Sequence, residues 1–154
     1  MKLRIYTDTS VIGGCLDPEF QVASVRLVER FKLGEAVIVL SELTRLELVN
    51  APDKVRDVLK GTPEEHREYL DLTTEAKKLA ERYLNEGVIG PGKRIDAQHI
   101  AIATVSRVDV LVSWNFRHIV NLARIRGYNS VNLRQGYPVL EIRSPLEVFV
   151  DEEY

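Results

Sequence analysis

LRIYTDTSVIGG, residues 3–14, begins with a short apolar run that ends at an acid. The run Leu3–Thr7 has the length and composition of a buried strand, and Asp8 follows it directly. Two further runs share this pattern, AVIVL at 36–40 and VDVLVS at 108–113. Because longer helical patterns separate the three runs, we expect parallel strands joined by right-handed crossovers. The sequence therefore predicts a three-layer α/β/α sandwich with a mostly parallel central sheet.

Glycines and hydroxyl side chains mark where the expected helices begin and end. Ser41 suits an N-cap, as does Thr73 or Thr74, while Gly34 and Gly127 directly follow two helical patterns. The glycine- and proline-rich stretch 87–94 is expected to be a loop. We expect a last strand at 139–143 and helices at 21–33, 42–50, 52–59, 75–85, 96–107 and 116–126.

The bulk composition describes one compact, intracellular domain. With 154 residues, 45% of them hydrophobic, the chain can bury one core, so we expect a single domain over residues 1–154. Its 21 Lys and Arg against 23 Asp and Glu give no global basic field, which argues against a passive, high-affinity DNA binder. Cys15 is the only cysteine, and no stretch approaches the ~20 apolar residues of a membrane span. We expect a soluble cytoplasmic protein whose acidic tail, 151–153, is solvated.

Four polar residues stand at junctions between strands and helices. Asp8 follows the first strand, Asn115 follows the third, Glu47 lies in the helix after the second, and Asp96 begins a helix. Parallel α/β sheets bind ligands at the carboxyl ends of their strands, so these side chains are expected to converge there. Because clustered carboxylates repel one another, the cluster predicts a compensating hard divalent cation.

Each acid also has a purely structural interpretation. Asp8 is a suitable N-cap, and Asp96 suits the positive end of a helix dipole. Glu47 could lie on a solvated face, although its neighbours Leu46 and Leu48 indicate a largely buried helix. One shared site accounts for all three acids together better than three separate structural roles do.

These motifs resemble the PIN domain family, in particular its VapC-like toxin nucleases. The resemblance covers nearly the whole chain and rests on four short motifs in a fixed order. They are YTDTSVIG at 6–13, Glu47 in the helix after the second strand, DAQHIAIA at 96–103 and LVSWNFRHI at 111–119. The chain departs from the family at Asn115, where many members have Asp.

The resemblance implies an endoribonuclease that uses Mg²⁺ or Mn²⁺, acts on RNA, pairs with an antitoxin protein and forms a homodimer. Its catalytic residues would be Asp8, Glu47, Asp96 and Asn115. Asp8 and Asp96 would be the main metal ligands, and Glu47 would bind through water or orient the nucleophile. Asn115 offers a neutral carbonyl oxygen but removes one charge, so a second metal should bind weakly. The alternative is a catalytically weakened PIN-like module that binds RNA or protein.

Basic and aromatic residues near these motifs are candidates for holding RNA. Arg45 lies two residues before Glu47, and Arg117 lies two residues after Asn115. Lys93 and Arg94 lie three and two residues before Asp96. These four cations are candidates for contacting phosphates. Trp114 could stack on a base, but its place after a strand favours packing. His99 shares a helical face with Asp96, and its default interpretation is a hydrogen-bonded structural histidine.

Overall fold

Five parallel strands form the central sheet, in the order β3-β2-β1-β4-β5. This computed structural model describes residues 2–149, so the acidic tail lies outside the described residues. The strands are β1 (Arg4–Thr7), β2 (Val37–Ser41), β3 (Arg67–Leu70), β4 (Val110–Val112) and β5 (Ile142–Arg143). The predicted mostly parallel sheet is confirmed.

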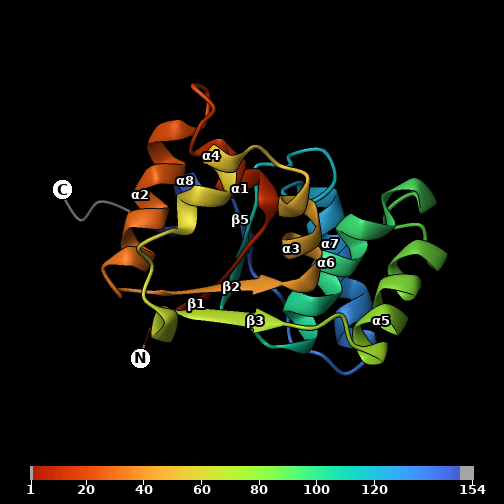
Figure 1. Cartoon of the computed structure of the whole chain (residues 1–154). Helices are drawn as coiled ribbons and strands as arrows, with labels where there is room; N and C mark the ends of the chain where they lie inside the picture. The colour runs from red at the N-terminus through yellow and green to blue at the C-terminus, as the bar shows by residue number, and fades with distance from the viewer. Residues whose placement is uncertain (1, 150–154) are drawn as a thin grey trace, which may run out of the picture.

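Helices cover both faces of the sheet (Figure 1). One face carries α1 (Thr9–Gly14), α2 (Gln21–Lys32) and α8 (Pro145–Val148). The other carries α5 (Thr74–Asn85), α6 (Arg94–Val105) and α7 (Leu122–Arg134). Connecting segments contain α3 (Glu42–Val49), α4 (Asp53–Arg56), η1 (Asp57–Leu59), η2 (Glu64–His66) and η3 (Pro91–Lys93). The predicted three-layer α/β/α sandwich is confirmed.

Alternating side chains of the strands supply two separate cores. In β1, Ile5 packs with α1 and α2, whereas the next residue, Tyr6, packs with α5 and α6. The same alternation places Ile38 and Val39 of β2 on opposite faces. All four side chains are fully buried, which explains why these strands read as continuous apolar runs.

Strand β3 was not expected from the sequence. Two of its four residues, Arg67 and Glu68, are charged, and only its register beside β2 makes it a strand. Arg4 of β1 reaches across to Glu68, with Nη2 2.6 Å from Oε1 and Nε 2.9 Å from Oε2. Charged edge strands are common because they discourage pairing with other chains, and this lowers their hydrophobic signal.

The helix predicted at 116–126 is wrong. The structure instead begins α7 at Leu122, after the N-cap Asn121, whose side chain accepts a hydrogen bond from the backbone of Arg124. Gly127 does not end the helix but lies inside it, where an added Cβ would meet Cγ1 of Val88 at 2.7 Å. Close packing, not helix termination, therefore requires this glycine.

The other predicted elements are confirmed with shifted ends. The helix expected from Asp96 begins at Arg94, and the last strand is shortened to Ile142–Arg143. Ser41 and Thr73 are side-chain N-caps as predicted. Throughout the part of the chain described, no helix combines the length and apolar character needed to cross a membrane.

The topology of the sheet places the candidate site. From β1 the chain moves to β2 and β3 on one side, and later to β4 and β5 on the other. The carboxyl ends of β1 and β4 therefore flank the topological switch point, where α/β sheets bind ligands. Asp8 follows β1 there, and Asn115 follows β4.

Candidate functional site

Asp8 is held by two serine hydroxyls at the end of β1. Ser10 Oγ donates to Oδ1 at 2.5 Å, and Ser113 Oγ donates to Oδ2 at 2.6 Å. The residue occupies the N-cap position of α1, but its side chain makes no capping hydrogen bond. Helix capping therefore does not explain this acid. Ser10 and Ser113 were not predicted as site residues, although each lies two residues from a predicted one.

The carboxyl of Asp8 is buried and forms no ion pair with any residue from 2 to 149. Only 6% of the residue is exposed, and burial raises the pKa of this carboxyl despite the opposing effects of the serine hydroxyls and His99. A buried carboxylate that forms no ion pair costs stability when it is ionised. A bound cation would remove this cost.

Asp96 lies in the first turn of α6, facing the same edge. Burial raises the pKa of its carboxyl, which His99, His118 and Lys93 lower and Glu47 raises further. The charge of Glu47 therefore disfavours ionisation of Asp96. Oδ2 of the Asp96 carboxylate also lies 3.5 Å from Nδ2 of Asn115. Like Asp8, it forms no ion pair within residues 2–149.

Glu47 reaches the site through a buried histidine. Its Oε1 lies 2.7 Å from Nε2 of His99, whose side chain is 3% exposed against 42% for that of Glu47. The other ring nitrogen of His99 lies 2.6 Å from the hydroxyl of Tyr6, which in turn donates to Ser41 at 2.8 Å. His99 is thus buried and hydrogen-bonded as predicted, and it also fixes the position of Glu47.

Helix α3 is less buried than the sequence suggested. Leu46 is 63% exposed, and within this helix only Leu43 and Thr44 are buried. The expectation of a largely buried helix around Glu47 is therefore wrong. Leu46 and Leu48 are two residues apart, so on a helix their side chains point in different directions, and apolar composition alone overstates burial.

Asn115 turns its amide nitrogen, not its oxygen, toward the acids. Its Oδ1 accepts hydrogen bonds from the backbone of Arg117 at 3.2 Å and His118 at 2.9 Å. Since backbone N–H groups can only donate, these two contacts fix the oxygen in the turn and leave Nδ2 facing Asp96. The neutral residue therefore donates toward a carboxylate where an acid would repel it.

Hydrogen bonds connect the two ends of the site. Ser113 Oγ donates to Asp8 and accepts from the backbone nitrogen of Asn115 at 2.9 Å, and the side chain of Asn115 faces Asp96. Ser113 and Asn115 thus link Asp8 to Asp96, and Glu47 lies beside them through its contact with His99.

The donor atoms fit a hard divalent cation at Asp8 and Asp96. Both offer carboxylate oxygens, the ligands that Mg²⁺ prefers, and neither forms an ion pair within residues 2–149. Across residues 2–149, however, no three His, Cys, Asp or Glu side chains are grouped as a metal cage would require. Such a cation would keep several waters, which is usual for Mg²⁺. Metal binding thus stays a prediction.

The four predicted RNA-binding cations divide into two pairs. Lys93 lowers the pKa of Asp96, and Arg117 follows Asn115 on the exposed turn, so both lie near the acids. Arg94 instead forms an ion pair with Glu81, and Arg45 lies over the ring of Tyr69, 5.0 Å from its centroid. Only Lys93 and Arg117 are placed to meet a substrate at this edge.

Trp114 is a packing residue, as its position indicated. It is 7% exposed, stacks on Phe20 with 4.5 Å between ring centroids, and donates from Nε1 to Ser24 Oγ at 2.8 Å. Its indole therefore has no exposed face for a base, and it anchors the turn that carries Asn115.

Comparison with known structures identifies the fold. No family model and no curated protein match the sequence. The chain does resemble solved structures. One is VapBC2 from Rickettsia felis bound to a DNA fragment from its promoter. It is 12% identical and has a TM-score of 0.58, and the match covers 92% of this chain and 98% of that one. The chain has a PIN-domain fold.

Two other structures share this PIN-domain fold. DNA-bound VapBC from Salmonella typhimurium is 22% identical, with a TM-score of 0.53 over 93% of this chain and 98% of that one. FitAcB from Neisseria gonorrhoeae is 12% identical, with a TM-score of 0.59 over 94% and 99% of the two chains. At such identities the likeness concerns the fold. Since folds host many functions, activity has to be argued from the acids at the sheet edge.

Proposed function

We propose that the protein is a metal-dependent endoribonuclease that hydrolyses RNA phosphodiester bonds, and that it is the toxin of a toxin–antitoxin pair. The observation that carries this proposal is a pair of carboxyls, the buried Asp8 and the half-buried Asp96, which form no ion pair within residues 2–149 and lie at the switch point of a PIN-domain sheet. The similarity to VapBC and FitAB structures supports the toxin assignment.

In this proposal each residue has a role that follows from its position. Asp8 and Asp96 would hold a Mg²⁺ or Mn²⁺ ion, which when bound makes water a better nucleophile and offsets charge on the phosphate. Glu47, held by His99, would orient the attacking water and accept its proton. Lys93 and Arg117 would contact phosphates on either side of the scissile bond.

RNA cleavage by purified protein tests this proposal. We expect cleavage of a long single-stranded RNA with Mg²⁺ or Mn²⁺ and none with a chelator. Asp8→Asn and Asp96→Asn should lower the rate by at least about 100-fold, as loss of a charge-stabilising group usually does. Asp71→Asn, which changes an exposed acid after β3, is the matched control and should keep full activity.

Failure of this test would favour the catalytically weakened RNA- or protein-binding module. If the protein cuts nothing, or if both variants cut as fast as the control, hydrolysis at this site is ruled out. The toxin role has its own readout, since expression should arrest the growth of host cells and Asp8→Asn should relieve the arrest. Light scattering would show whether the protein is the proposed homodimer, and co-purification with the product of an adjacent small gene would identify an antitoxin.

A further inference from the structure

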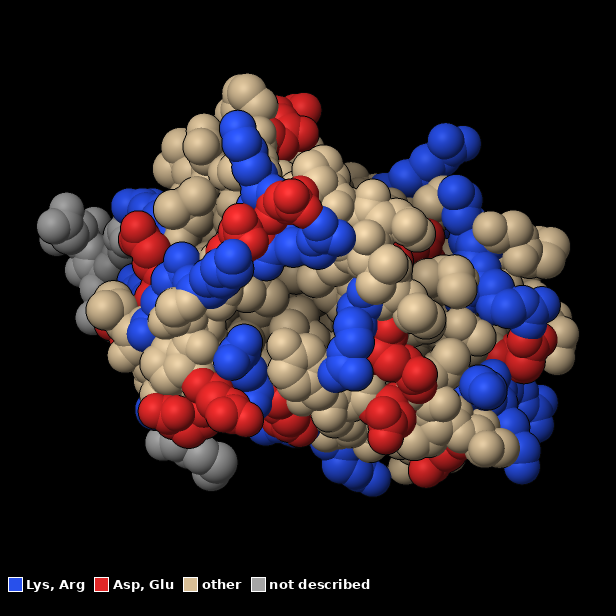
Figure 2. Space-filling model, viewed as in Figure 1, with Lys and Arg blue, Asp and Glu red and all other residues tan. Residues whose placement is uncertain are grey.

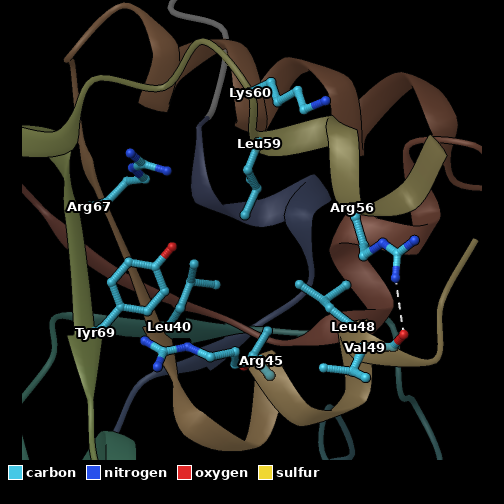
Figure 3. Close-up of a pocket in the computed structure, with 10 residues that line it drawn as sticks. Leu40, Arg45, Leu48, Val49, Arg56, Leu59, Lys60, Arg67 and Tyr69 are labelled. Atoms are coloured by element: carbon cyan, nitrogen blue, oxygen red, sulfur yellow. Dashed lines mark hydrogen bonds between the residues drawn. The ribbon is translucent and has the colours of Figure 1, made fainter. Parts of the chain in front are cut away.

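A second concave site lies beside α3, and Glu47 is not among the residues that line it. It is a pocket of about 370 Å³ between β3, α3 and the segment from α4 to η1 (Figure 3). Three leucines, Leu40, Leu48 and Leu59, supply aliphatic lining. Figure 2 shows this face hollowed near its centre, with Lys and Arg side chains around the hollow. The pocket is therefore apolar inside and cationic at its rim.

Two of the four rim cations have no carboxylate partner. Arg56 pairs with Asp53, and Lys60 with Asp57 at 2.8 Å. Arg45 instead rests on the ring of Tyr69, and no carboxylate within residues 2–149 pairs with it or with Arg67.

Arg67 has, in addition, a buried donor that nothing satisfies. Its Nε is shielded from water and has no hydrogen-bond partner among the described residues. Because Nε is shielded even from water, a ligand would bind through the two outer nitrogens of this guanidinium, which has no carboxylate partner within residues 2–149. Figure 3 shows Arg67 and Arg45 on the two sides of Tyr69. An anionic ligand would complete both guanidinium groups.

The strand beside this pocket has an unpaired edge. Within residues 2–149, β3 is the last strand of the sheet and pairs only with β2. Arg67 and Tyr69 are two residues apart on β3, so both side chains lie on the pocket face. An extended peptide that paired with this edge would direct alternate side chains over the pocket and its cations.

We propose that the β3 edge and this pocket together bind an extended acidic peptide segment of a partner protein. An aliphatic side chain of the peptide enters the leucine-lined pocket, and flanking carboxylates meet Arg45 and Arg67. The observations favour a peptide over single-stranded RNA, because RNA sites stack bases on open aromatic faces. Here the only aromatic side chain of the lining is Tyr69, and Arg45 covers one face of its ring. The proposal does not depend on RNA hydrolysis at the acid site.

Selection from a displayed library of random linear peptides tests this inference. We expect the wild-type protein to enrich peptides in which Asp or Glu alternates with aliphatic residues. Arg45→Gln and Arg67→Gln should each weaken the best synthetic peptide by about tenfold, because each removes one charge-assisted pair. The matched control is Arg82→Gln, an exposed arginine on α5, and it should bind the peptide as wild type does. Circular dichroism of each variant confirms its fold.

Two further measurements separate the proposal from its rivals. Saturating peptide should slow exchange of the β3 amides that point away from β2, because backbone pairing with the peptide would give these amides acceptors. A single-stranded oligouridine should not displace the peptide. The proposal is overturned if no peptides are enriched over the Arg45→Gln, Arg67→Gln double variant, if exchange in β3 does not change, or if the oligouridine binds the pocket instead.

Discussion

Nε2 of the buried His99 lies 2.7 Å from Oε1 of Glu47, the acid that sequence placed in the helix after the second strand. The two residues come from different helices, α6 and α3, and His99 is itself anchored to Tyr6 in the core. A half-exposed glutamate would otherwise sample several rotamers, so this contact restricts where its carboxylate can act.

His99→Gln should therefore lower kcat for RNA cleavage while changing KM little, because it releases Glu47 without touching the phosphate contacts. Loss of such a supporting hydrogen bond typically costs about 10- to 100-fold. Single-turnover kinetics of His99→Gln, Glu47→Gln and the double variant would measure the coupling. We expect the double variant to be no slower than Glu47→Gln alone, whereas strictly additive losses would show that the two residues act separately. The control is His66→Gln, because His66 belongs to η2 and not to α3 or α6.

Asn115→Asp should place a carboxylate opposite Asp96, where the amide nitrogen now lies 3.5 Å away. An aspartate can still accept the backbone hydrogen bonds of the turn, so the fold should persist. The added charge should tighten Mn²⁺ binding by about tenfold or more and create a second measurable site. Calorimetric titration with Mn²⁺ would compare Asn115→Asp with the wild type, for which we expect one site. Asn85→Asp, which adds the same charge on α5, is the control. Two tight sites in the wild type would contradict this prediction.

The metal-free protein should lose stability as pH rises above about 4, the ordinary pKa of an aspartate. Burial raises the pKa of Asp8 and of Asp96, so each carboxyl holds its proton more tightly when the chain is folded. Between the unfolded and folded pKa values the folded state binds more protons, and the free energy of unfolding therefore falls with rising pH.

Asp8→Asn should consequently raise the free energy of unfolding near neutral pH by about 0.5–2 kcal/mol, as other changes that relieve strained functional sites do. It should also flatten the pH profile. Urea denaturation in the presence of a chelator, at several pH values, checks both effects, and Asp71→Asn should change neither. A less stable Asp8→Asn protein at neutral pH would show that the serine hydrogen bonds outweigh the cost of burial.

Two adjacent glycines of α1 offer a test of packing beneath the site. A Cβ at Gly14 would lie 2.6 Å from Ser24 Oγ and 2.9 Å from Trp114 Nε1, and would break the hydrogen bond between them. Gly14→Ala should cost about 1–3 kcal/mol, in the range of overpacked cores. Gly13→Ala meets nothing within 4 Å and should be neutral or stabilising. Chemical denaturation followed by the fluorescence of Trp114, the only tryptophan, separates the two, and equal effects would contradict the packing.

The burial pattern of each strand and helix explains which of them could be predicted from the sequence. Strands β1, β2 and β4 are buried on both faces, so they read as apolar runs whatever their partners are. The expected positions of Asp8 and Asn115 after β1 and β4 followed from that assignment. Strand β3 and helix α7 were missed or misplaced because a charged edge strand and a glycine required for packing against Val88 carry no local signal.

The sequence by itself determined four of the five strands, their parallel sense and the edge where Asp8, Glu47 and Asp96 were expected, because hydrophobic burial and capping act over a few neighbouring residues. The tertiary structure alone decided that His99 holds Glu47 and that Asn115 turns its nitrogen to Asp96. Only the tertiary structure shows that Arg45 lines the pocket beside β3 and not the acid site. These outcomes depend on which side chains and backbone groups from distant segments meet, and such hydrogen bonds have no periodicity that a sequence could show.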